Sequence, residues 1–107
     1  MKTSTQRCTA LSPEPLELGT IVITPAANAA LSAEEVLSAV SRHTYGDWGE
    51  LDAEDWIANK RALVDSERIL SAYCSGNGAK FYVITEWHRM FTTVLLSEDI
   101  IESVLFQ

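Results

Sequence analysis

Residues 43–56, with the sequence HTYGDWGELDAEDW, are the most informative stretch for the fold. This stretch holds one histidine, two glycines, three large aromatic residues and five acids in fourteen positions. Such a composition is too polar for a core strand and too aromatic for a plain linker. Gly46 and Gly49 permit backbone angles that other residues rarely adopt, and Trp48 and Trp56 can each bury a large area. We expect a rigid corner that is anchored by tryptophan and displays its carboxylates outward.

The corner lies between two expected helices. Upstream, Ser32 and Glu35 form a capping box that starts the first helix, which ends near His43. Its apolar residues at helical spacing are Val36, Leu37 and Val40. Downstream, Asp52 is the expected N-cap of a second helix that ends near Asp65. The expected apolar face of this second helix consists of Ala53, Trp56, Ile57, Leu63 and Val64.

Strand patterns flank the helical part. Residues 18–24 are rich in β-branched side chains and stop at Pro25, which predicts a first strand. Three further strands are expected as a meander, at residues 68–74, 80–87 and 90–96. Residues 75–78 (SGNG) form the turn between the first two of them. Alternation along the middle strand predicts one face that carries Phe81, Val83, Thr85 and Trp87.

The expected order is β-α-α-β-β-β-α, with a last helix that begins at Ser97. The apolar stripe of that helix is Ile100, Ile101, Val104 and Leu105. This order favours a single α+β domain in which two helices pack against a four-stranded, mostly antiparallel sheet. We expect the domain to span residues 17–107, and residues 1–16 to form a mobile polar leader.

The composition restricts the classes of function. Fifteen acids against eight bases give a formal net charge of −7, which disfavours bulk binding to DNA or RNA. No run approaches the ~18 apolar residues of a membrane span, and the leader lacks the apolar core of a secretory signal. Cys8 and Cys74 follow no pattern, which fits a reducing cytoplasm better than a disulfide between them.

The sequence predicts no cofactor and no metal site. It contains neither a C-x-x-C nor an H-E-x-x-H pair, and His43 and His88 are 45 positions apart. No G-x-S-x-G motif points to an activated serine. The glycines of residues 75–78 precede a strand rather than a helix, so a hairpin turn explains them better than a phosphate cradle.

Three segments resemble a family of small proteins carried on bacterial plasmids, phages and integrated elements. They are RHTYGDWGELDAEDWIANKRAL, ERILSAY and KFYVITEWHRMFTTVLL. The most specific parts are residues 46–49 (GDWG) and the set Ile84, Thr85, Glu86 and Arg89. The resemblance covers residues 20–100 and implies a mobile-element setting, but no established activity. Some members are labelled as a restriction-enzyme subunit, which this chain, without a glycine-rich cofactor loop, does not support.

The first functional hypothesis is a non-enzymatic protein that acts by contact with a host or element protein. An acidic surface with aromatic neighbours could occupy a basic groove on its partner, as a regulator or a counter-defence inhibitor would. The alternative explanation of the acids is helix capping and solubility. The expected contact residues are His43, Tyr45, Asp47, Trp48, Glu50, Asp52 and Trp56, with Arg89 nearby. A homodimer through an edge strand of the meander is also open.

The second hypothesis is a metal-independent ribonuclease or related hydrolase. His43 could exchange protons near neutral pH. Arg68 and Arg89 could stabilise charge that develops on a phosphate, and Glu86 could act with Arg89. A plain surface pair between Glu86 and Arg89, worth ~0–1 kcal/mol, is the alternative. Catalysis requires that all four side chains converge on one open cleft, and the acidic charge weighs against RNA binding.

Overall fold

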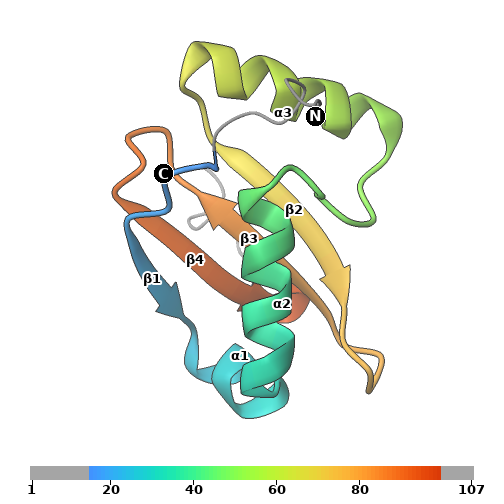
Figure 1. Ribbon diagram of the computed structural model, residues 1–107. Coiled ribbons are helices and arrows are strands. Elements are labelled where there is room, and N and C mark those ends of the chain that lie inside the picture. Colours follow the sequence, from blue (N-terminus) through green and yellow to red (C-terminus); the bar gives the residue numbers. More distant parts are fainter. Residues whose placement is uncertain (1–14, 100–107) are drawn as a thin grey trace, which may run out of the picture.

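The computed structural model describes residues 15–99 and shows an α+β domain. Its elements are β1 (Thr20–Ile23), α1 (Pro25–Ala30), α2 (Ala33–Thr44), α3 (Ala53–Asp65), β2 (Ile69–Cys74), β3 (Lys80–Thr85), β4 (Phe91–Leu96) and the 3-10 turn η1 (Ser97–Asp99) (Figure 1). The expected fold class and the four strands are confirmed. We call residues 45–52, which join α2 to α3, the elbow.

The four strands form one mixed sheet in the order β1-β4-β3-β2. The meander of β2, β3 and β4 is antiparallel, whereas β1 runs parallel to β4. Parallel neighbours need a long crossover connection, and here α1, α2, the elbow and α3 all lie between β1 and the meander. The sheet therefore has two edge strands, β1 and β2.

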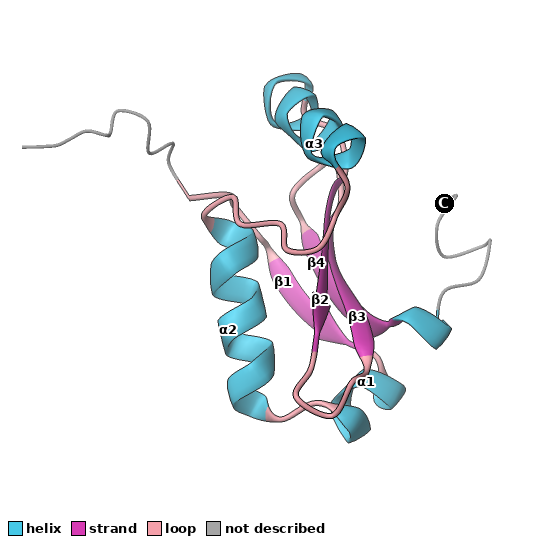
Figure 2. Cartoon of the chain, turned by 90° about the vertical axis from the view of Figure 1, so that its right-hand side faces the viewer, coloured by secondary structure: helices cyan, strands magenta, loops and turns pink. Residues whose placement is uncertain are grey.

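The core lies between α2 and one face of the sheet (Figures 1 and 2). The expected capping box starts α2: the Glu35 N–H donates to Ser32 Oγ at 3.1 Å, and the Ser32 N–H donates to Glu35 Oε1 at 3.0 Å. The buried apolar cluster consists of Ala27, Leu31, Val36, Ala39, Tyr73, Phe81, Val83, Val94 and Leu96.

The structure contains a short helix, α1, that the sequence did not predict. Thr24 caps it, because its Oγ1 accepts from the Ala27 N–H at 3.1 Å, and Pro25 occupies its first turn. Both are usual helix-start residues. A proline after a β-branched run can also simply end a strand. Six residues are too few to show helical periodicity, so the sequence alone did not distinguish a strand end at Pro25 from the start of a helix.

Helix α3 lies across the end of the sheet next to β2 (Figure 1). The Asn59 side chain donates to Leu70 O at 2.7 Å and accepts from the Leu70 N–H at 3.2 Å. The expected apolar face of this helix is wrong, because Asn59 and Ala62 are its buried residues. The members of that face that are exposed are Ala53, Ile57, Leu63 and Val64. A helix that meets a strand edge buries a narrow stripe, so periodicity located α3 but not its packed side.

Two further expectations change at the end of the meander. Strand β3 ends at Thr85, because the chain then turns: the Arg89 N–H donates to Glu86 O at 2.9 Å, and the Glu86 N–H donates to Phe91 O at 3.0 Å. Trp87, expected to share one strand face with Phe81, Val83 and Thr85, instead lies in that turn and is 62% exposed. The described part of the expected last helix is η1, and its stripe of residues 100, 101, 104 and 105 lies outside the described residues, as do residues 1–14 of the expected leader.

Candidate functional site

The elbow extends the sheet beyond β2. The Ala72 N–H donates to Trp48 O at 3.1 Å, and the Glu50 N–H donates to Ala72 O at 2.8 Å, which makes a parallel bridge between Gly49 and Ala72. Gly49 has φ +76°, and a Cβ built on it would lie 2.0 Å from Ala72 O. Only glycine therefore allows this close backbone approach.

Trp48 anchors the elbow, as the sequence predicts. Its side chain is 3% exposed and packs with Ala62 and Ile69 in a second buried cluster. The Trp56 ring, tilted by 58°, stands 4.9 Å from it between centroids, a separation at which aromatic pairs attract. Leu16 also packs against this cluster. Because Trp48 is buried, its role in this structure is to support the elbow from inside.

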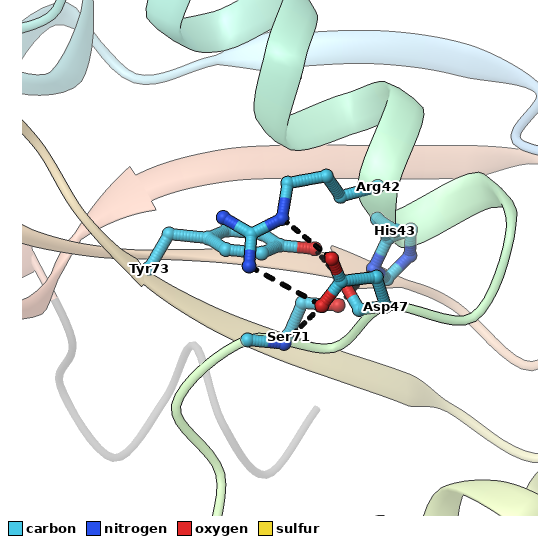
Figure 3. A network of polar contacts seen from close by, with 6 residues as sticks. Arg42, His43, Asp47, Ser71 and Tyr73 are labelled. Atoms are coloured by element: carbon cyan, nitrogen blue, oxygen red, sulfur yellow. Dashed lines mark hydrogen bonds and ion pairs between the residues drawn. The ribbon is translucent and has the colours of Figure 1, made fainter.

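Asp47 is held by a network that the sequence did not reveal (Figure 3). Arg42 Nε donates to Asp47 Oδ2 at 2.8 Å, and Arg42 Nη2 donates to Oδ1 at 3.2 Å. The guanidinium stands 4.6 Å above the Tyr73 ring, and the Tyr73 hydroxyl donates to Asp47 O at 2.7 Å. The hydrogen bonds from Arg42 lower the pKa of Asp47, and a bond from the Gly49 N–H adds to this effect. Asp47 therefore has a structural role: its contacts fix the conformation of the elbow.

His43 lies inside the protein, 1% exposed. Its Nδ1 is 2.5 Å from Ser71 Oγ and its Nε2 is 2.8 Å from Thr85 Oγ1. The chain of hydroxyls continues from Thr85 to Thr92 at 2.8 Å, and Thr92 donates to Leu18 O at 2.7 Å. Burial lowers the pKa of His43 to about 4, and the charge of Arg89 contributes. The ring is neutral at pH 7 and ties α2 directly to β2 and β3, and through the Thr85 hydroxyl to β4.

Arg89 also has a structural role. It adopts φ +62°, and its Nη1 donates to Glu67 O at 2.6 Å and to Glu86 O at 3.0 Å. Its Nη2 donates to Ala62 O at 3.2 Å. These carbonyls lie at the C-terminal end of α3 and in the β3–β4 turn, so the guanidinium clamps the two together. Partial burial lowers its pKa.

The structure brings together three of the four residues of the nuclease hypothesis. Arg68 Nη2 and Glu86 Oε1 form an ion pair at 3.0 Å, and Arg89 bonds the backbone of Glu86. Glu86 thus pairs with Arg68, instead of with Arg89 as considered from the sequence. His43 points from α2 toward the sheet and is 1% exposed, so it cannot reach a substrate in this conformation. The four side chains do not share an open cleft, so the geometry gives this hypothesis no accessible general base.

Fewer of the expected contact residues are exposed than the sequence predicts. Tyr45 is exposed, Trp56 is half-buried, and the carboxylates of Glu50 and Asp52 face solvent. Glu50 Oε1 accepts from Cys74 Sγ at 3.5 Å, and Asp52 caps α3 by accepting from the Asp55 N–H at 2.9 Å. Of the seven expected contact residues, His43 and Trp48 are therefore internal.

Among the described residues, neither metal binding nor membrane spanning finds support. Within residues 15–99, no group of three or more His, Cys, Asp and Glu side chains is placed to hold a metal ion. The helices of the same range are too short and too polar to cross a bilayer. A scan of protein-family models, a search of curated proteins and a search of solved structures each returned no match. The resemblance to the mobile-element family therefore stays a prediction.

Proposed function

We propose that this protein acts by contact with another protein, as a regulator or counter-defence inhibitor in the mobile-element setting that the resemblance implies. The observation that carries the proposal is the placement of exposed apolar side chains. Within the described residues, seven of the ten exposed large hydrophobic side chains belong to the elbow, α3 and the β3–β4 turn with the residue that follows it. They are Tyr45, Ile57, Leu63, Val64, Trp87, Met90 and Phe91, which we call the contact surface.

These elements lie at the same end of the molecule (Figure 1). Arg89 ties the β3–β4 turn to α3 through Ala62 O and Glu67 O, so the surface is supported before a partner arrives. Trp87, Met90 and Phe91 are of residue types enriched at protein interfaces, and tryptophan is prominent among hot spots. A preorganised surface loses less conformational entropy on binding.

The charge around this surface indicates the chemistry of the partner. Four acidic side chains lie in the elbow and in the first turn of α3: Glu50, Asp52, Glu54 and Asp55. Within residues 15–99, none of them forms an ion pair. A partner with an apolar groove bordered by basic groups would complement both features, and the opposite charges would speed the encounter. We also expect a cytoplasmic setting, where the exposed free thiol of Cys74 would stay reduced.

The test is affinity capture from a native host with mass spectrometry. Wild type is compared with Trp87→Ala and Val64→Lys, which alter exposed positions and should leave the fold intact. The matched control is Ser41→Lys, which adds the same charge at an exposed position of α2, outside the contact surface. We expect a protein that wild type and the control retain and that both surface variants lose, with affinity about 30-fold weaker for a hot-spot change of ~2 kcal/mol. Equal capture by all four folded proteins would contradict the proposal.

A further inference from the structure

The second edge of the sheet, strand β1, is open within the described residues 15–99. The Thr20 N–H donates to Met90 O at 2.9 Å and the Thr24 N–H donates to Val94 O at 3.0 Å. Because backbone groups alternate along a strand, the even-numbered residues of β1 face β4, whereas Ile21 and Ile23 direct their N–H and C=O groups outward. In the part of the chain that the structure describes, these outward groups have no hydrogen-bond partner.

An apolar groove runs beside this open edge. It has a volume of about 420 Å³ and is lined by Ile23, Asn28, Leu31, Ala33, Val36 and Leu37. Leu37 is 70% exposed at its rim, and Ile21 is also exposed. The register with β4 places Ile21 and Ile23 on the sheet face that α2 covers. Ile23 belongs both to the open strand and to the groove lining, so the strand edge and the groove adjoin at β1.

We propose that a second copy of this chain binds here, by antiparallel pairing of β1 with β1 about a two-fold axis through Val22. Ile21 then lies opposite the second copy's Ile23, and the outward N–H and C=O groups of both residues are satisfied in each copy. The joined strands form a sheet of eight strands. The two grooves meet over the axis, and Leu37 of each copy closes the groove of the other.

Self-complementarity and charge favour a second copy as the occupant. A two-fold interface uses the same patch on both partners, and this patch carries a projecting leucine directly beside an apolar groove. A chain with a net charge of −7 repels its own copies over most of its surface. Neither β1 nor the groove lining contains a charged residue, so two copies can approach there. An open, apolar strand edge is in addition a template for pairing.

The test is sedimentation of the full chain from micromolar to sub-millimolar concentration, with amide hydrogen exchange at both ends of the range. We expect a species of twice the 11.8 kDa chain mass, and protection of the Ile21 and Ile23 amides that rises with concentration. Added salt should tighten the dimer, because it screens the repulsion between two acidic chains. A protein that stays monomeric throughout, or amides that exchange equally at both concentrations, would overturn the proposal.

Variants locate the interface. Ile21→Pro removes an outward N–H, and Leu37→Lys places a charge at the rim of the groove; each should raise the dimer dissociation constant about tenfold or more, a change of ~1.4 kcal/mol. Val64→Lys, on the contact surface, should leave it unchanged. A dimer that survives both β1-side variants, or one that Val64→Lys disrupts, would place the interface elsewhere. The inference does not rest on the proposed function, since the two use different residues.

Discussion

The two edges of the sheet differ in whether their outward backbone groups are hydrogen-bonded. At β2, the Asn59 side chain occupies the outward groups of Leu70, and the elbow occupies those of Ala72. At β1, the outward groups of Ile21 and Ile23 are free within the described residues. The aromatic, acidic stretch that looks functional in the sequence closes one edge, while a plain apolar strand leaves the other available. An unusual composition can therefore mark a structural demand as readily as a binding site.

The largest effect is expected at Gly49, on the closed edge. Gly49→Ala places a Cβ against Ala72 O and the Tyr73 ring at a positive φ, so the elbow must detach from β2. We expect a loss of about 4 kcal/mol in the free energy of unfolding, measured by urea denaturation. Gly46→Ala is the control: it also has a positive φ but no atom within 4 Å, and should lose about 1 kcal/mol. Equal losses would mean that the elbow does not pack on β2.

A pair of proline substitutions compares the two edges directly. Ala72→Pro removes the hydrogen bond to Trp48 O and should lower the free energy of unfolding by about 3 kcal/mol. Ile21→Pro removes an N–H without a partner in the described chain and should cost less than about 1 kcal/mol. Both are measured by urea denaturation at a concentration where the protein is monomeric. Similar losses at the two positions would remove the distinction between a closed and an open edge.

The buried histidine on the closed side predicts a pH dependence. The folded pKa of His43 is about 4, below the ordinary value near 6.5 of the unfolded chain. As pH falls from about 6.5 to about 4, the unfolded chain takes up the proton first, so stability falls by up to about 3 kcal/mol.

The control is His43→Gln, which keeps polar atoms but does not titrate in this range. The difference in free energy of unfolding between wild type and this variant should shrink as pH falls from neutral to about 4, while carboxylate effects cancel. A difference that is constant with pH would show that the imidazole is solvated in the folded protein.

The smallest change in stability is expected for the ion pair between Arg42 and Asp47. Both side chains are about half exposed, so solvent screens their attraction, and a double-mutant cycle with alanine should give a coupling energy of ~0.5–1 kcal/mol. Raising the salt concentration should reduce this coupling. A coupling of several kcal/mol would mean that the pair is desolvated and that it, rather than Trp48 and Gly49, dominates the closure of the edge.

Local patterns in the sequence were sufficient for most of the fold. The Ser32–Glu35 capping box, the Asp52 N-cap and the glycine turn at residues 75–78 all act within a few residues, so they can be recognised without tertiary contacts. Alternation located the strands of the meander, and the two tryptophans predicted an anchored corner. The α+β class followed from the order of these elements.

The candidate site could not be predicted in the same way. His43 is polar, and only its contacts with Ser71 and Thr85, far away in the sequence, show that it is satisfied inside the core. Asp47 looks free until Arg42 folds over Tyr73 to meet it. Ile57 and Val64 belong to a helical apolar pattern, yet they face solvent because α3 packs through Asn59 and Ala62.

The sequence by itself therefore determined α2, α3, the four strands and the anchored elbow, because short-range hydrogen bonding and hydrophobic periodicity specify them. Only the tertiary structure decided which edge of the sheet is closed and which is open. It also decided which polar side chains are internal and which apolar ones are exposed. Those outcomes depend on how separate elements meet in space, and a residue's own chemistry does not say what will lie opposite it.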